Sequence, residues 1–90
     1  RGLGDVYKRQ VIGLTKALAR ELAPEGITVN CVSPGIIDTR MNAQFSSEEL
    51  ADEVPMGRLG TPEEVAQAIF FFSQADYVTG QVLGVNGAII

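Results

Sequence analysis

The sequence predicts an α/β fold with parallel strands. Residues 27–32 form a short run of mostly apolar and β-branched residues, which is typical of a parallel strand buried on both faces. A second short run, 81–85, follows a helical pattern over residues 61–73. Two strands joined through such a helix are expected to form a right-handed parallel crossover. Because two strands leave sheet edges uncovered, we expect these 90 residues to be a piece of a larger sheet.

Composition argues against several classes of function. The net charge is −4 with no basic stripe, so we expect no nucleic-acid partner. The chain has no histidine, which removes His-based metal sites and Ser-His or Cys-His relays. Its single cysteine, Cys31, fits a reducing, cytoplasmic compartment and is expected to be a packed hydrophobe. There is no long apolar run and no secretory leader, so we expect no membrane span.

The first ten residues differ from those that follow. Residues 1–10 hold three of the seven basic residues, which leaves four basic and ten acidic residues in 11–90. They show no clear helical or strand period and resemble a translated sequencing adapter. We therefore predict that residues 1–10 are a foreign or disordered leader, and that the native domain occupies residues 11–90.

Two helices flank the first strand and the polar stretch after it. An apolar stripe with a 3.6-residue period predicts a helix over residues 11–23, ended by Pro24 and by Gly26 as a left-handed cap. A short helix capped by Ser46 or Ser47 is expected within the polar stretch.

The last helix has the strongest local start signal. Thr61 is the expected N-cap, Pro62 takes the first helical position, and Glu64 completes a capping box. The helix is predicted to run to about Ser73. Its last turns are apolar nearly all round, so we expect the phenylalanines at 70–72 to be buried on several sides.

The loop that follows the first strand is the candidate binding site. Ligands of open parallel sheets lie outside the carboxyl ends of the strands, which is where this loop begins. Pro34 and Gly35 shape its turn, Ile37 offers an apolar surface, and Thr39 offers a hydroxyl group. The alternative interpretation is an ordinary proline-glycine turn.

Five ordered segments of residues 11–90 resemble the short-chain dehydrogenase/reductase family, most closely its 3-oxoacyl-acyl-carrier-protein reductase branch. They are Val11-Ile12-Gly13-Leu14-Thr15-Lys16, Gly26-Ile27-Thr28-Val29-Asn30, Ser33-Pro34-Gly35-Ile36-Ile37-Asp38-Thr39, Gly57-Arg58-Leu59-Gly60 and Tyr77-Val78-Thr79-Gly80-Gln81. The resemblance implies the C-terminal part of a doubly wound, parallel-sheet Rossmann fold, in the order helix, strand, lid, helix, strand, with an incomplete sheet.

The resemblance also implies an NADP(H) or NAD(H) cofactor in the intact parent. By its pattern, the backbone at Ile37 holds the nicotinamide carboxamide, Thr39 reaches the carboxamide or pyrophosphate, and Pro34 and Gly35 shape the turn beneath the ring. Residues 41–55 match the substrate-covering lid. The positions of the family's catalytic Tyr and Lys fall at Gly4 and Lys8. A glycine has no proton to give and we take the lysine at position 8 to be accidental, so we expect no catalytic residue in this chain and no activity from it alone.

The implied function of the parent is the NADPH-dependent reduction of 3-oxoacyl-acyl-carrier protein in fatty-acid synthesis. Its partners would be a small-molecule or carrier-bound substrate and further copies of itself, as a homotetramer. Two alternatives stay open: a sugar, polyol or diketone dehydrogenase of the same family, and a non-enzymatic interaction module.

Overall fold

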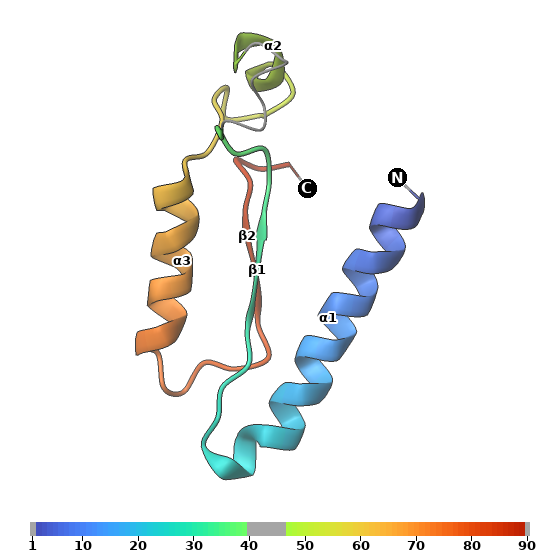
Figure 1. Cartoon of the computed structure of the whole chain (residues 1–90), viewed down its shortest axis with the longest axis vertical. Coiled ribbons are helices and arrows are strands. Elements are labelled where there is room, and N and C mark those ends of the chain that lie inside the picture. The colour runs from blue at the N-terminus through green and yellow to red at the C-terminus, as the bar shows by residue number, and fades with distance from the viewer. Residues whose placement is uncertain (1, 40–46, 90) are drawn as a thin grey trace. The chain divides into compact units, whose positions relative to one another are not determined.

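The computed structural model describes residues 2–39 and 47–89 (Figure 1). Their elements are, in chain order, α1 (Gly2–Leu22), the 3₁₀ helix η1 (Ala23–Glu25), β1 (Cys31–Pro34), α2 (Ser47–Ala51), α3 (Pro62–Gln74) and β2 (Val82–Val85). The chain divides into two compact units, which we call the first unit (Arg1–Cys31 and Phe72–Leu83) and the second unit (Val32–Phe71 and Gly84–Ile90). The predicted order of helix, strand, helix and strand is confirmed.

Helix α1 of the first unit begins at Gly2, well before the predicted start at Val11. Residues 2–10 contain no proline, and once a helix exists each added residue gains a hydrogen bond at little extra entropic cost. The expectation of a leader without regular structure is therefore corrected for residues 2–10. Their foreign origin stays a prediction.

The buried side of α1 is narrower than the predicted apolar stripe. Thr15 and Ala19 are buried, whereas Leu14 is 60% exposed and Val11 is exposed as well. The Thr15 hydroxyl donates a hydrogen bond to the carbonyl of Val11 at 2.7 Å, so its burial leaves no unpaired polar group. Ala19 faces Gly80, where an added Cβ would lie 3.5 Å from the Ala19 Cβ. Small side chains therefore let α1 approach the loop before β2.

The end of α1 is closed as predicted. The chain tightens into η1, and Gly26 then takes a left-handed conformation with φ 76°. Its N–H donates to the carbonyl of Ala23 at 3.0 Å. This is the glycine cap that the sequence predicts at this position.

Strand β1 begins at Cys31, later than the predicted start at residue 27. Val29 and Asn30 are instead tied to the loop before β2 through side chains. The Val29 N–H donates to Thr79 Oγ1 at 3.0 Å, Asn30 Nδ2 donates to the carbonyl of Val78 at 2.9 Å, and the N–H of Gln81 donates to Asn30 Oδ1 at 3.0 Å. The N–H of Gly80 also donates to the carbonyl of Val29 at 2.8 Å, so side-chain bonds and one backbone bond together join this stretch to the loop before β2.

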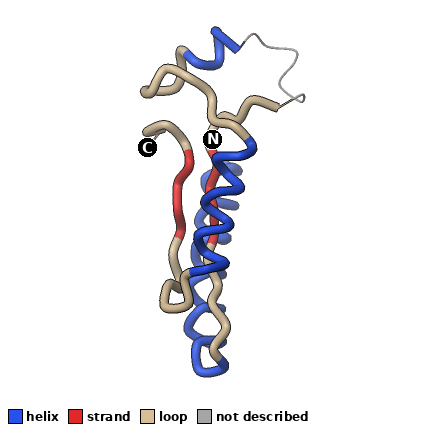
Figure 2. Tube along the Cα trace, turned by 90° about the vertical axis from the view of Figure 1, so that its left-hand side faces the viewer, coloured by secondary structure: helices blue, strands red, loops and turns tan. Residues whose placement is uncertain are grey.

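The two strands pair in a two-stranded sheet, drawn in red in Figure 2. The N–H of Cys31 donates to the carbonyl of Gln81, and the N–H of Gly35 donates to the carbonyl of Val85, both at 2.9 Å. The residue number rises equally on both strands between these bonds, so the strands are parallel. The predicted parallel pair with a helical crossover is confirmed.

The core of the described residues is small. Its buried apolar side chains are Ala19 of the first unit and Val54, Leu59 and Ala68 of the second. Helix α3 begins and ends close to the predicted positions, but Phe70 and Phe71 are 65% and 53% exposed. The expectation that this end of α3 is buried on several sides is therefore wrong for this chain, because so small a core cannot cover it.

No helix in the described part of the chain has both the length and the apolar character needed to span a membrane. The predicted cap of α2 at Ser46 lies outside the described residues, as does the side chain of Ser47.

Candidate functional site

The four predicted cofactor residues lie in the second unit, at the carboxyl end of β1. Pro34 is the exposed last residue of the strand, Gly35 and Ile37 are half-buried, and Thr39 is exposed. They belong to one continuous loop. Their binding role stays a prediction.

Gly35 is required by a close contact inside the protein. Its N–H donates to the carbonyl of Val85, and a Cβ added to it would lie 2.7 Å from the Cβ and 2.8 Å from the Cα of Asn86. Gly35 does not have a positive φ. Glycine is therefore needed here for the approach of Asn86, a contact that the local sequence could not indicate.

Ile37 is joined to Gly60 by an isolated parallel bridge. The carbonyl of Ile36 accepts from the N–H of Gly60 at 3.0 Å, and the N–H of Asp38 donates to the carbonyl of Gly60 at 2.8 Å. The peptide groups of Ile37 itself point to the side opposite Gly60, because successive residues of an extended chain alternate. The bridge thus fixes the orientation of one N–H donor and one carbonyl acceptor.

Two cavities lie beside this loop within the second unit. The first, of about 280 Å³, is lined by Ile36, Val54, Met56, Arg58 and residues 84–87, among others. The second, of about 310 Å³, is lined by Asp38, Arg58 and residues of α2. Pro34, Gly35, Ile37 and Thr39 line neither. Since ligand pockets typically measure about 300–1,000 Å³, these cavities could surround only part of a dinucleotide.

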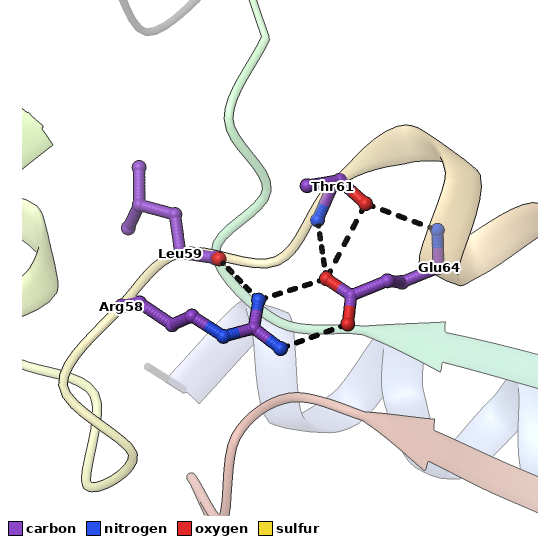
Figure 3. A network of polar contacts seen from close by, with 4 residues as sticks. All are labelled: Arg58, Leu59, Thr61 and Glu64. Atoms are coloured by element: carbon purple, nitrogen blue, oxygen red, sulfur yellow. Dashed lines mark hydrogen bonds and ion pairs between the residues drawn. The ribbon is translucent and has the colours of Figure 1, made fainter.

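Arg58 stands in the wall of both cavities and belongs to a network of charged and polar groups (Figure 3). Its guanidinium makes a two-pronged ion pair with Glu64, with Nη1–Oε1 and Nη2–Oε2 each at 2.8 Å, and Nη1 also donates to the carbonyl of Leu59 at 3.0 Å. Such paired bonds fix the arginine head in one orientation. In this chain, Arg58 is therefore bound to the first turn of α3 through Glu64.

The same network closes the predicted capping box. The Thr61 N–H donates to Glu64 Oε1 at 3.0 Å, and the Glu64 N–H donates to Thr61 Oγ1 at 3.2 Å. The capping box is therefore confirmed. The bonds from Arg58, and after them the backbone bond from Thr61, lower the pKa of Glu64 to about 2, and Glu64 raises the pKa of Arg58.

Glu64→Gln should remove an acid-sensitive contribution to stability. The folded pKa of Glu64, about 2, lies below the ordinary value of 4.5, so its ionised form stabilises the fold above pH 4.5 and this contribution is lost as the pH falls toward 2. Glutamine keeps an acceptor for the capping box, so the change isolates the ion pair. We expect wild type to be more stable than the variant at neutral pH, with the difference closing toward pH 2 in urea unfolding.

Glu63→Gln is the matched control, because Glu63 lies in the same first turn of α3 and carries the same charge. It should leave the pH profile of unfolding close to that of wild type. Equal profiles for the two variants would show that the Arg58 pair contributes nothing.

The positions expected for the catalytic pair lie in α1 of the first unit. Lys8 is exposed there, beside an exposed Tyr7. Among the described residues, no group of three or more cysteine and carboxylate side chains could hold a metal ion. The absence of a catalytic residue stays a prediction.

Comparison with known proteins covers nearly the whole chain. The family described as "Enoyl-(Acyl carrier protein) reductase" matches residues 3–88, a range that includes most of the predicted leader. An uncharacterized oxidoreductase of Bacillus subtilis, YmfI, is 54% identical over 77 residues, covering 80% of this chain and 32% of that protein. The 3-oxoacyl-[acyl-carrier-protein] reductase FabG of Aquifex aeolicus is 46% identical over 87 residues, covering 91% and 35%. The chain thus spans about a third of the length of these relatives.

Two solved structures have the same fold. YwfH, an NADPH-dependent reductase involved in bacilysin biosynthesis, matches with a TM-score of 0.83 and 34% identity, over 91% of this chain and 37% of its own. ElxO with NADP bound matches with a TM-score of 0.80 and 40% identity, over 89% and 36%.

Proposed function

This chain belongs to the short-chain dehydrogenase/reductase family of oxidoreductases, and on that premise we propose that its parent protein uses NADP(H) to reduce 3-oxoacyl-acyl-carrier protein to the 3-hydroxyacyl form. Two similarities support the proposal. Relatives named as this reductase are 46% identical to the chain. Two proteins with the same fold are described with these cofactors, YwfH as an NADPH-dependent reductase and ElxO with NADP bound.

The observation that carries the proposal is the 46% identity of nearly the whole chain to relatives named as this reductase. The bridge to Gly60 also turns the Ile37 peptide groups to one side of the loop. A primary carboxamide such as that of nicotinamide has one carbonyl acceptor and an amine donor, which complement a peptide N–H and C=O. The residues present therefore fit the nicotinamide end of the cofactor.

The chain's own part in the reaction would be to hold and orient the nicotinamide cofactor. The cofactor, when bound, supplies the hydride. The peptide of Ile37 would hold the carboxamide, and the Thr39 hydroxyl would add a hydrogen bond, so that one face of the ring is presented to the substrate carbonyl. Gly35 sets where this loop leaves β1, since its N–H is bonded to Val85. Positioning of this kind is a principal protein contribution to hydride transfer.

Thr39→Ala in the full-length protein that carries this sequence should weaken binding of reduced cofactor about tenfold, which is the loss expected for one hydrogen bond to a polar ligand group. Fluorescence titration with NADPH measures the dissociation constant. Thr39→Ser keeps the hydroxyl and should bind like wild type.

An unchanged dissociation constant in Thr39→Ala would contradict the proposed role of the loop. The reaction itself is tested by comparing kcat/KM for a 3-oxoacyl thioester with values for sugar, polyol and diketone substrates. Preference for one of the latter would replace the acyl-thioester assignment while keeping the family.

A further inference from the structure

The turn at the end of β2, residues 85–88, contacts the cofactor loop. Asn86 lies against Gly35 so closely that a Cβ on the glycine would be 2.7 Å from the Asn86 Cβ. Next to this contact, the carbonyl of Val85 accepts the Gly35 N–H at 2.9 Å. Both interactions lie within the second unit. The position of Asn86 therefore determines where the loop can begin.

The same turn contacts the segment that returns from the predicted lid. The carbonyl of Gly87 accepts the N–H of Met56 at 3.1 Å. An added Cβ on Gly87 would lie 2.6 Å from Cγ1 of Val54, and Val54 is buried. Two neighbouring residues of one turn thus hold the start of the cofactor loop and the base of the predicted lid.

The amide of Asn86 holds this turn in an uncommon backbone conformation. Gly87 and Ala88 have φ values of 58° and 76°, and Ala88 is the one non-glycine residue with positive φ in the described chain. An alanine in this region is strained, because its Cβ crowds the following carbonyl oxygen. Asn86 Oδ1 accepts the N–H of Ala88 at 3.1 Å, and the Asn86 carbonyl accepts the N–H of Ile89 at 3.2 Å. These bonds offset the strain and keep the turn in place.

From these contacts we infer that Asn86 is a positioning residue, which acts through the turn 85–88 to keep the nicotinamide loop and the base of the lid in register. The inference rests on the proposed function. Asn86 need not touch the cofactor or the substrate. Its effect passes through Gly35 on one side and through Gly87 on the other.

The test is Asn86→Ala in the full-length protein. The change removes the acceptor for Ala88 but keeps the Cβ against Gly35, so the turn loses this restraint while the contact with the glycine stays. We expect the dissociation constant for NADPH and the KM for the thioester substrate each to rise about tenfold, because shifts of about an ångström or less weaken positioned contacts. Asn86→Asp keeps the acceptor and should stay within about twofold of wild type.

Asn30→Ala is the matched control. Asn30 is likewise half-buried and makes side-chain bonds to backbone groups, but it belongs to the first unit and its bonds are to Val78 and Gln81 instead of to the turn 85–88. It should lower the melting temperature at least as much as Asn86→Ala while leaving both binding constants unchanged. A purely structural role for Asn86 predicts that the two alanine variants behave alike.

The outcomes separate this inference from the proposed function. If wild type binds NADPH and Asn86→Ala binds it equally well, the positioning role is wrong and the proposed function stands. If Asn86→Asp loses binding as Asn86→Ala does, the acceptor for Ala88 is not what matters, and the inference is also wrong. If wild type itself binds no NADPH, the proposed function fails first.

Discussion

Gly35→Ala lowers the free energy of unfolding of the full-length protein by about 2–3 kcal/mol, the upper part of the range for adding atoms to a filled site. The new Cβ would lie 2.7 Å from the Cβ and 2.8 Å from the Cα of Asn86. The second of these contacts is with backbone, so no change of rotamer relieves it. The loop or the turn 85–88 must move. Urea unfolding measures the change against wild type.

Gly13→Ala is the control for this prediction. Gly13 lies within α1, and an added Cβ there meets nothing within 4 Å. The change should therefore raise stability by about 0.5–1 kcal/mol, because alanine loses less backbone entropy than glycine in a helix. A Gly35→Ala protein as stable as Gly13→Ala would contradict the close approach of Asn86.

Gly87→Ala destabilises the protein by about 2–3 kcal/mol, because strain and overpacking add at this position. The residue has φ 58°, where side chains are disfavoured, and its added Cβ would lie 2.6 Å from Cγ1 of the buried Val54. Gly57→Ala separates the two effects. Gly57 has φ 80° but nothing within 4 Å of the added Cβ, so only the strain of about 1 kcal/mol should remain.

A double-mutant cycle locates the clash at Gly87. Val54→Ala removes the methyl group that the new Cβ would meet. It is destabilising alone, but in the Gly87→Ala background its cost should shrink by about 1 kcal/mol, because the two changes compensate in volume. Strictly additive effects of the two changes would contradict the contact.

Features set by neighbouring residues could be predicted from the sequence. The capping box at Thr61 and Glu64 needs only residues three apart, and the left-handed cap at Gly26 needs only the end of one helix. Both are present in the structure. The parallel strand pair also followed from local patterns, since a helix between two short apolar runs allows few other topologies.

Features set by distant residues could not be predicted. Just before β1, the Asn30 side chain bonds to the backbone of Val78 and Gln81, which lie far along the chain. The start of α1 was missed for another reason. Residues 2–10 have no apolar period of their own, and they lengthen a helix whose sequence signal starts only at residue 11. Long-range bonding and helix propagation leave no local sequence signal.

The candidate site divides in the same way. The sequence correctly predicted a loop at the carboxyl end of β1, but it did not indicate which contacts hold that loop in position. Gly35 has the sequence context of a turn glycine. In the structure, however, glycine is needed there because Asn86 lies too close to leave room for a Cβ. The final Asn86-Gly87 pair could be recognised only as the end of a strand. Its contacts with Gly35 and Val54 depend on how the chain folds back.

The bridge between Ile37 and Gly60 closes the stretch of chain between them into a loop whose two ends are held together. Its two ends are tied by hydrogen bonds of 2.8 and 3.0 Å, so the entry and exit points stay together whatever length of chain connects them. Lengthening such a loop costs little, since closure entropy grows only with the logarithm of its length. A change of length within this loop could therefore leave its two ends in place, whereas Val54, Met56 and Arg58 within it are held by contacts with Gly87 and Glu64.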